Sequence, residues 1–73
     1  MEELDLRGVK CPMNFVKTRL KLDKMEPGAL LCVYLDPGEP VESVSESVKS
    51  EGHLIESTEE QTDKSFRVLI KRA

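Results

Sequence analysis

The residues in this sequence best suited to covalent chemistry are its two cysteines, Cys11 and Cys32. Cys11 is followed by Pro12 and then by Met13–Met25, a segment without glycine or proline. Proline is favoured at the first position of a helix, where its missing N–H would have no partner anyway. The pattern therefore predicts that Cys11 lies at the N-terminal tip of a helix.

A cysteine at that place is expected to be a reactive thiolate. Unpaired backbone N–H groups and the positive end of the helix dipole meet there and favour the anion over the thiol. Such surroundings bring a cysteine pKa from about 8.5 into a range of roughly 3.5–7.5. Arg7, Lys10 and Lys17 are close in sequence and can add positive potential. The alternative is a helix-capping Cys11 without chemistry, although Ser, Thr, Asp or Asn caps better.

The other candidate reactive residues are expected to be structural. Cys32 lies within the apolar run Leu30–Leu35, which favours a buried, inert thiol. His53, the only histidine, is far in sequence from Cys11. A cysteine hydrolase needs a base beside its nucleophile, whereas exchange of sulfur between thiolates does not. The sequence therefore favours a sulfur carrier over a hydrolase.

The pattern of apolar residues and breaks predicts one domain over residues 1–73 with the order βαβαββ. The expected elements are a strand at Leu4–Arg7, a helix at Met13–Met25, a strand at Leu30–Leu35, a helix from Glu39 to before Gly52, and strands at His53–Ser57 and Ser65–Lys71, the last two joined by a polar hairpin loop at Glu59–Lys64. Right-handed crossovers place both helices on one face of a four-stranded mixed sheet. The expected fold is thus an α/β (α+β) two-layer sandwich.

Composition narrows the function classes. The net charge of −3 argues against a domain that mainly neutralises phosphates, so nucleic acid is an unfavoured partner. No apolar run approaches the roughly 20 residues that span a membrane, and the acidic N-terminus lacks a secretory pattern. The absence of a CxxC motif or histidine cluster predicts no metal and no cofactor. We therefore expect a cytoplasmic protein with no membrane partner.

The first helix is expected to have two apolar stripes. One contains Phe15, Thr18, Leu22 and Met25 and is expected to face the core. The other contains Met13, Val16 and Leu20 and begins beside Cys11. It can be a docking strip for a partner protein, or it can be a set of exposed apolar residues without a role. The cations along this region are Lys10, Lys17, Arg19, Lys21 and Lys24, either an electrostatic guide or a solvated face.

The segment around Cys11 resembles the LDxRGxxCPxP signature of the TusA/SirA family of sulfur-carrier proteins. The similarity covers nearly the whole chain and falls on Leu4–Pro12, Met25–Gly28, Asp36–Pro37, Glu51–Leu54 and Phe66–Lys71. The resemblance implies a four-stranded mixed sheet with two helices, like the C-terminal domain of translation initiation factor three. It also implies a sulfurtransferase that needs no cofactor.

In the family, the motif cysteine accepts sulfane sulfur from a cysteine desulfurase or a rhodanese-like donor. The resemblance therefore implies that Cys11 carries a persulfide and passes it to an acceptor protein thiol, for tRNA thiolation, molybdenum-cofactor maturation or sulfur metabolism. Gly8 and Pro12 would shape the turn around Cys11, and Arg7 and Lys10 would be electrostatic candidates. Asn14 departs from the motif by replacing its second proline. A non-catalytic interaction or regulatory module and a weak RNA-binding domain are the alternatives.

Overall fold

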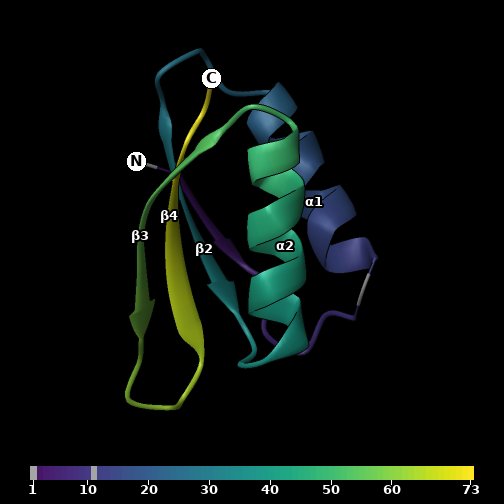
Figure 1. The fold of residues 1–73 in the computed structure, drawn as a ribbon, viewed down its shortest axis with the longest axis vertical. Helices are drawn as coiled ribbons and strands as arrows, with labels where there is room; N and C mark the ends of the chain where they lie inside the picture. Colours follow the sequence, from purple (N-terminus) through teal and green to yellow (C-terminus); the bar gives the residue numbers. More distant parts are fainter. Residues whose placement is uncertain (1, 11) are drawn as a thin grey trace.

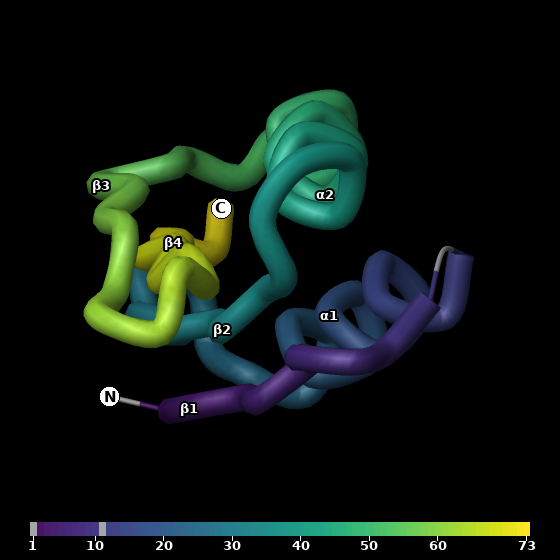
Figure 2. The backbone as a smooth tube through the Cα atoms, turned by 90° about the horizontal axis from the view of Figure 1, so that it is seen from below, coloured from purple at the N-terminus to yellow at the C-terminus, as the bar shows by residue number. Residues whose placement is uncertain are grey.

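The computed structural model describes residues 2–10 and 12–73, so Met1 and Cys11 lie outside the described residues. The elements are β1 Glu2–Asp5, α1 Met13–Asp23, β2 Leu30–Leu35, α2 Glu39–Ser50, β3 Leu54–Glu60 and β4 Phe66–Lys71. The strands form one sheet in the order β1-β2-β4-β3, and both helices lie against one face of it (Figures 1 and 2). The predicted two-layer sandwich and its βαβαββ order are confirmed.

The two central strands carry the core. β1 pairs with β2 in parallel, while β4 pairs antiparallel with both β2 and β3. Side chains on the helix-facing side of the central strands are buried, namely Leu31, Val33, Leu35, Val68 and Ile70. β2 is a central strand and is apolar on both faces. On the face away from the helices, Cys32 is buried, and Leu30 and Tyr34 are partly buried.

The helices close the core from one side. α2 buries Val44 and Val48 against the sheet, and α1 buries Thr18 and Leu22. Phe15 and Met25, also expected on the core face, are partly buried and pack against the same cluster. The stripe predicted from helical spacing is therefore confirmed for Phe15, Thr18 and Leu22, whereas Met25 contacts the core from two residues beyond the end of α1.

Several element boundaries differ from the sequence prediction. α1 ends at Asp23, two residues before the expected Met25, because Pro27 and Gly28 follow and the chain turns before β2. β1 lies two residues earlier than expected, because its pairing with β2 runs from Glu2 opposite Leu31 to Asp5 opposite Tyr34. β3 continues to Glu60, so the expected hairpin loop at Glu59–Lys64 is wrong in its first two residues. Backbone pairing with β4 holds these polar residues in a strand, which side-chain polarity alone does not indicate.

The sheet face away from the helices holds the second cysteine. Cys32 is completely buried, as predicted, although no helix covers it. The Arg67 guanidinium lies over it, with Nε 3.0 Å from the Cys32 sulfur. Arg67 and Tyr34 are both half-buried on the same face. Cys32 is therefore enclosed and fits the expected inert role.

Candidate functional site

The turn that leads into α1 is attached to the end of β2. The Leu6 N–H donates to the Tyr34 carbonyl at 2.8 Å, which continues the β1–β2 pairing by one bond. The Val9 N–H then donates to the Leu6 carbonyl at 3.1 Å, and Gly8 between them has φ +81°. This is the position of a type II turn that requires glycine. Gly8 therefore shapes the turn between β1 and the start of α1.

A side chain from the next loop holds this turn in place. The Gly8 N–H donates to the Asp36 carboxylate at 2.7 Å. Asp36 directly follows β2, so the turn before α1 and the turn before α2 are joined at one end of the sheet. The sequence prediction did not assign Asp36 a role at the site. The available sequence signal was an acidic residue, Asp36, directly after the apolar run Leu30–Leu35.

The start of α1 lies one residue later than expected, since the sequence predicted Pro12 as the first helical residue. Pro12 is the N-cap residue, with φ −92°, and the helix begins at Met13. The Asn14 N–H donates to the Lys10 carbonyl at 3.2 Å, and the Val16 N–H donates to the Pro12 carbonyl at 3.0 Å. Helical hydrogen bonding therefore reaches back to Lys10. Cys11 lies between Lys10 and Pro12 in sequence, and the reactivity of its thiol remains a prediction.

The cations expected to support Cys11 have different surroundings. The Arg7 guanidinium forms ion pairs with Asp5 at 2.7 Å and with Asp63 at 2.9 Å, and its centre lies 5.7 Å from the centroid of the Tyr34 ring. Hydrogen bonds from Arg7 lower the pKa of the Asp5 carboxyl to about 2. Two carboxylates thus compensate the Arg7 charge, which favours a structural role. Lys10 is exposed beside the helix start.

Asn14 is the residue of the motif with the most unusual environment. It is completely buried, in line with Thr18 and Leu22 at four-residue spacing. Its Oδ1 accepts the Phe15 N–H at 2.7 Å, and the Thr18 hydroxyl donates to its carbonyl at 2.8 Å. Its Nδ2 is buried and has no hydrogen-bond partner among the described residues. A buried donor left unpaired costs about 1–3 kcal/mol.

Sequence reasoning missed the burial of Asn14. The expected core stripe started from the apolar Phe15 and continued to Thr18 and Leu22, so it left out the polar Asn14 one position earlier. The four-residue spacing from Asn14 through Thr18 to Leu22 was the signal that could have found it.

The second stripe of α1 faces away from the core. Met13, Val16 and Leu20 expose 50%, 36% and 55% of their surfaces. We call these three residues the α1 strip. They are the most exposed large apolar side chains on the described helices, and the expectation that they lie on the surface is confirmed.

The cations along α1 divide between two sides of the helix. Arg19 forms an ion pair with Glu51 at 3.3 Å and so faces α2. Lys21 pairs with Glu2 of β1 at 2.8 Å. A shallow hollow of about 270 Å³ beside the α1 strip is lined by Leu4, Lys17, Leu20, Lys21 and Lys24. Three lysines therefore lie next to the apolar strip, whereas Arg19 belongs to the interface between the helices.

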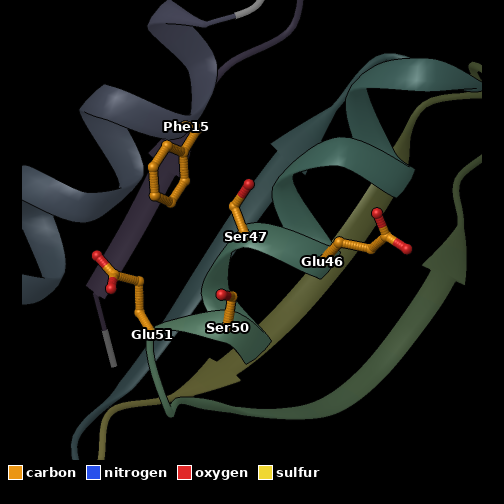
Figure 3. A pocket seen from close by; sticks show the side chains of 5 residues that line it. All are labelled: Phe15, Glu46, Ser47, Ser50 and Glu51. Atoms are coloured by element: carbon orange, nitrogen blue, oxygen red, sulfur yellow. The ribbon is translucent and has the colours of Figure 1, made fainter.

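The groove between the helices lies on the other side of α1. Figure 3 shows Phe15 facing Ser47 and Glu51 across a groove of about 380 Å³, which Glu46 and Ser50 also line. Its polar groups are carboxylates and hydroxyls from α2. No three His, Cys, Asp or Glu side chains are grouped for a metal ion anywhere in residues 2–10 and 12–73. The carboxylates of Glu46 and Glu51 therefore do not belong to such a group.

His53 lies at the opposite end of α1 from the motif. Its Nδ1 accepts the Ala73 N–H at 3.0 Å, and it borders a hollow with Asp23, the last residue of α1. A helix of 11 residues is about 16 Å long, so His53 is far from the start of α1 at Met13. This agrees with its expected structural role. Within the described part of the chain, no helix is long and apolar enough to cross a membrane.

These features define a small two-layer α/β protein whose motif lies at the start of its first helix. The family model for the sulfurtransferase TusA matches residues 2–72, and the chain belongs to that family. The family supports a role in sulfur transfer that involves sulfur donor and acceptor proteins.

Curated relatives agree with this assignment. A proposed sulfur carrier protein from Archaeoglobus fulgidus is 42% identical over 97% of this chain and 81% of its own length. A proposed sulfur carrier protein from Thermotoga maritima is 37% identical over 93% of this chain and 86% of its own. The chain is thus similar to sulfur carriers along nearly its whole length.

Solved structures show the same fold. The crystal structure of a SirA-like protein from Desulfitobacterium hafniense superposes with a TM-score of 0.85 over 97% of this chain and 96% of the other, at 19% identity. The solution structure of a protein from Helicobacter pylori gives a TM-score of 0.74 at 18% identity, over 99% and 97% of the two chains. At these identities the similarity concerns the arrangement of strands and helices.

Proposed function

We propose that this protein is a sulfurtransferase that carries sulfur as a persulfide on Cys11. The main support is the start of α1, where Pro12 is the N-cap directly after Cys11 and Gly8 and Asp36 hold the preceding turn. A thiolate at a helix N-terminus is stabilised by the helix dipole and nearby N–H groups. The family to which the chain belongs supports the same chemistry.

The proposed cycle conserves electrons and needs no cofactor. The Cys11 thiolate attacks the outer sulfur of a persulfide on a donor protein, such as a cysteine desulfurase or a rhodanese-like protein. An S–S bond forms on Cys11 while the donor's S–S bond breaks, and the donor cysteine leaves as a thiolate. An acceptor thiolate then attacks the outer sulfur on Cys11 in the same way and regenerates the Cys11 thiolate.

A mass measurement after sulfur loading tests this function. The protein is incubated with a cysteine desulfurase and cysteine, and its intact mass is then measured without reductant. We expect one added sulfur atom on the wild type and none on Cys11→Ser. Cys32→Ser should still be loaded, because Cys32 is completely buried. A loaded Cys11→Ser protein, or an unloaded wild type, would contradict the proposal and favour a non-catalytic interaction module.

We further propose that the α1 strip docks the sulfur donor or acceptor protein. Transfer requires the partner's cysteine to approach Cys11, and the strip extends along α1 from the helix start. Its apolar side chains are exposed and adjoin a hollow with three lysines. The surface therefore suits a partner with an apolar patch bordered by carboxylates.

A further inference from the structure

The sheet face away from the helices has no second layer of structure over it within residues 2–10 and 12–73 (Figure 2). We call it the open sheet face. β2 is apolar at every position of Leu30–Leu35, a composition typical of strands that are covered on both faces. On the open side, however, Leu30 and Tyr34 are only partly buried, and so is Leu69 of β4, which lies opposite Cys32. The centre of this face is therefore apolar and lacks the cover that its composition favours.

Charged side chains on the open sheet face are separated by sign. Residues that pair across a sheet point to the same face, and Glu3 of β1 pairs with Cys32 of the open face. Asp5 is two residues further along β1 and shares this face. On the other side of β2, the open-face residues of β4 include the cations Arg67 and Lys71. Carboxylates thus border the apolar centre on one side, and cations border it on the other.

We propose that two copies of this chain associate through their open sheet faces, about a two-fold axis that lies between the sheets and runs parallel to β2, directly over it. In such an interface the same surface meets itself, so it must be complementary to its own rotated image. Rotation about this axis places β1 of one copy over β4 of the other. The apolar residues of the two β2 strands then meet in the middle, as in an aligned packing of two sheets.

The register determines which charges meet. Asp5 and Arg67 lie in one row across the sheet, so the rotation places each of them over the other in the second copy. In the same way Glu3 lies over Leu69, and Lys71 is the next open-face residue, about 7 Å along the strand. The long lysine side chain spans this distance. Glu3 and Lys71 are exposed and form no ion pair with any described residue, so both are free to pair between copies.

The charges disfavour the other two-fold arrangements of these faces. An axis between β2 and β4 would place β1 over β3, and so Asp5 over Glu59, which lies in the row of Arg67. An axis over β4 would place Arg67 and Lys71 against their own copies. An axis across the strands would place β1 over β1 and therefore carboxylates over carboxylates. Like charges that meet in an interface oppose association, so the axis over β2 is selected.

The size of the contact predicts a weak dimer. The overlap is three strands wide and six residues long, which corresponds to roughly 300 Å² in projection. Stable interfaces bury about 800 Å² per partner, so we expect an equilibrium between monomer and dimer that depends on concentration. Both helix layers face outward in this arrangement, so the α1 strip of each copy stays accessible.

Sedimentation equilibrium with exchanged charges tests the proposal, with reductant present so that no disulfide joins the chains. For the wild type we expect the average mass to rise from one chain at about 10 µM toward two chains at about 1 mM, as for a weak interface. Glu3→Lys and Lys71→Glu should each weaken association by about tenfold or more, because each creates two like-charge contacts per dimer. An equimolar mixture of the two variants should associate like the wild type, because opposite charges meet again in the mixed dimer.

Glu42→Lys and Lys49→Glu are the matched controls. They change the net charge by the same amounts at exposed positions of α2, in the helix layer, and should leave association unchanged. A dimer formed through the α1 strip is the competing arrangement, and it would be lost in Leu20→Glu but kept in Glu3→Lys. The proposed interface predicts the reverse.

Two results would overturn the proposal. One is a wild-type protein that stays monomeric at the highest concentration, and the other is a mixture that associates no better than its two components. Chemical-shift changes in the wild type cover the case in which a variant fails to fold. As the concentration rises, the backbone amides of Leu30, Tyr34 and Leu69 should shift, whereas those of α2 should not. Shifts confined to the helices would place the contact elsewhere and contradict the proposed interface.

Discussion

At the scale of single residues, the site depends on backbone conformation as much as on side chains. Gly8 adopts φ +81° in an exposed turn, and its N–H donates to Asp36. A side chain at Gly8 would meet no atom within 4 Å, so any cost of adding one comes from the left-handed backbone and not from a clash. The same holds for Gly52, which has φ +92° at the far end of α2.

These two glycines provide a matched pair of variants. Gly8→Ala and Gly52→Ala should each lower the free energy of unfolding by about 1 kcal/mol, measured by urea denaturation. Only Gly8→Ala should also slow the alkylation of Cys11, because only that turn leads into α1. If both variants changed the labelling rate equally, the Gly8 turn would have no specific part in presenting Cys11.

At the scale of elements, α1 combines two faces with different tasks. The buried face carries Asn14, Thr18 and Leu22, and the exposed face carries the α1 strip with lysines beside it. Because α1 has apolar residues on two sides, its hydrophobic pattern alone does not decide which side is buried. Packing against the sheet and α2 decides it. The exposed face is then available to another protein.

Substitution on the exposed face tests the docking proposal. Leu20→Glu should slow sulfur loading by about tenfold or more, since it places a carboxylate against an apolar, acid-bordered partner surface. Leu54→Glu is the control, because Leu54 is also 55% exposed but lies on β3. Both variants should keep the wild-type melting temperature. Equal loading rates for Leu20→Glu and the wild type would show that the strip does not dock the donor.

At the scale of the whole molecule, one ion network joins parts distant in sequence. Arg7 in the turn after β1 pairs with Asp5 and with Asp63, which lies between β3 and β4. The Asp63 carboxylate also accepts hydrogen bonds from Ser65, which lower the pKa of Asp63. The network thus links the turn before α1 to the β3–β4 hairpin at the surface.

The network predicts how stability depends on pH. The pKa of Asp5 falls from an ordinary 3.8 to about 2 in the folded protein, mainly through its hydrogen bond to Arg7. Its stabilising effect is therefore present above pH 3.8 and is lost as the pH falls toward 2. Asp5→Asn should melt at a lower temperature than the wild type at pH 6, and the difference should shrink between pH 4 and pH 2.

Two controls separate the ion pair from other effects of this substitution. The difference in melting temperature at pH 6 should shrink in high salt, which screens exposed charges. Most of its pH dependence should also disappear when Asp5→Asn is compared with its parent in an Arg7→Gln background. A difference that stayed constant from pH 6 to pH 2 would contradict the assignment to Asp5.

The sequence by itself determined the order of elements, the single sheet with both helices on one face, and a helix that begins after Pro12. These follow from local signals: apolar periodicity, Pro12 after the cysteine, and Gly8 in the turn. Tertiary structure decided which polar groups are buried and which charges are paired. The burial of Asn14 and the pairing of Arg7 with Asp63 depend on residues brought together by the fold, and the second contact spans 56 positions of the chain. No local pattern encodes the Arg7–Asp63 contact, because it forms only when β1 and the β3–β4 hairpin have joined one sheet.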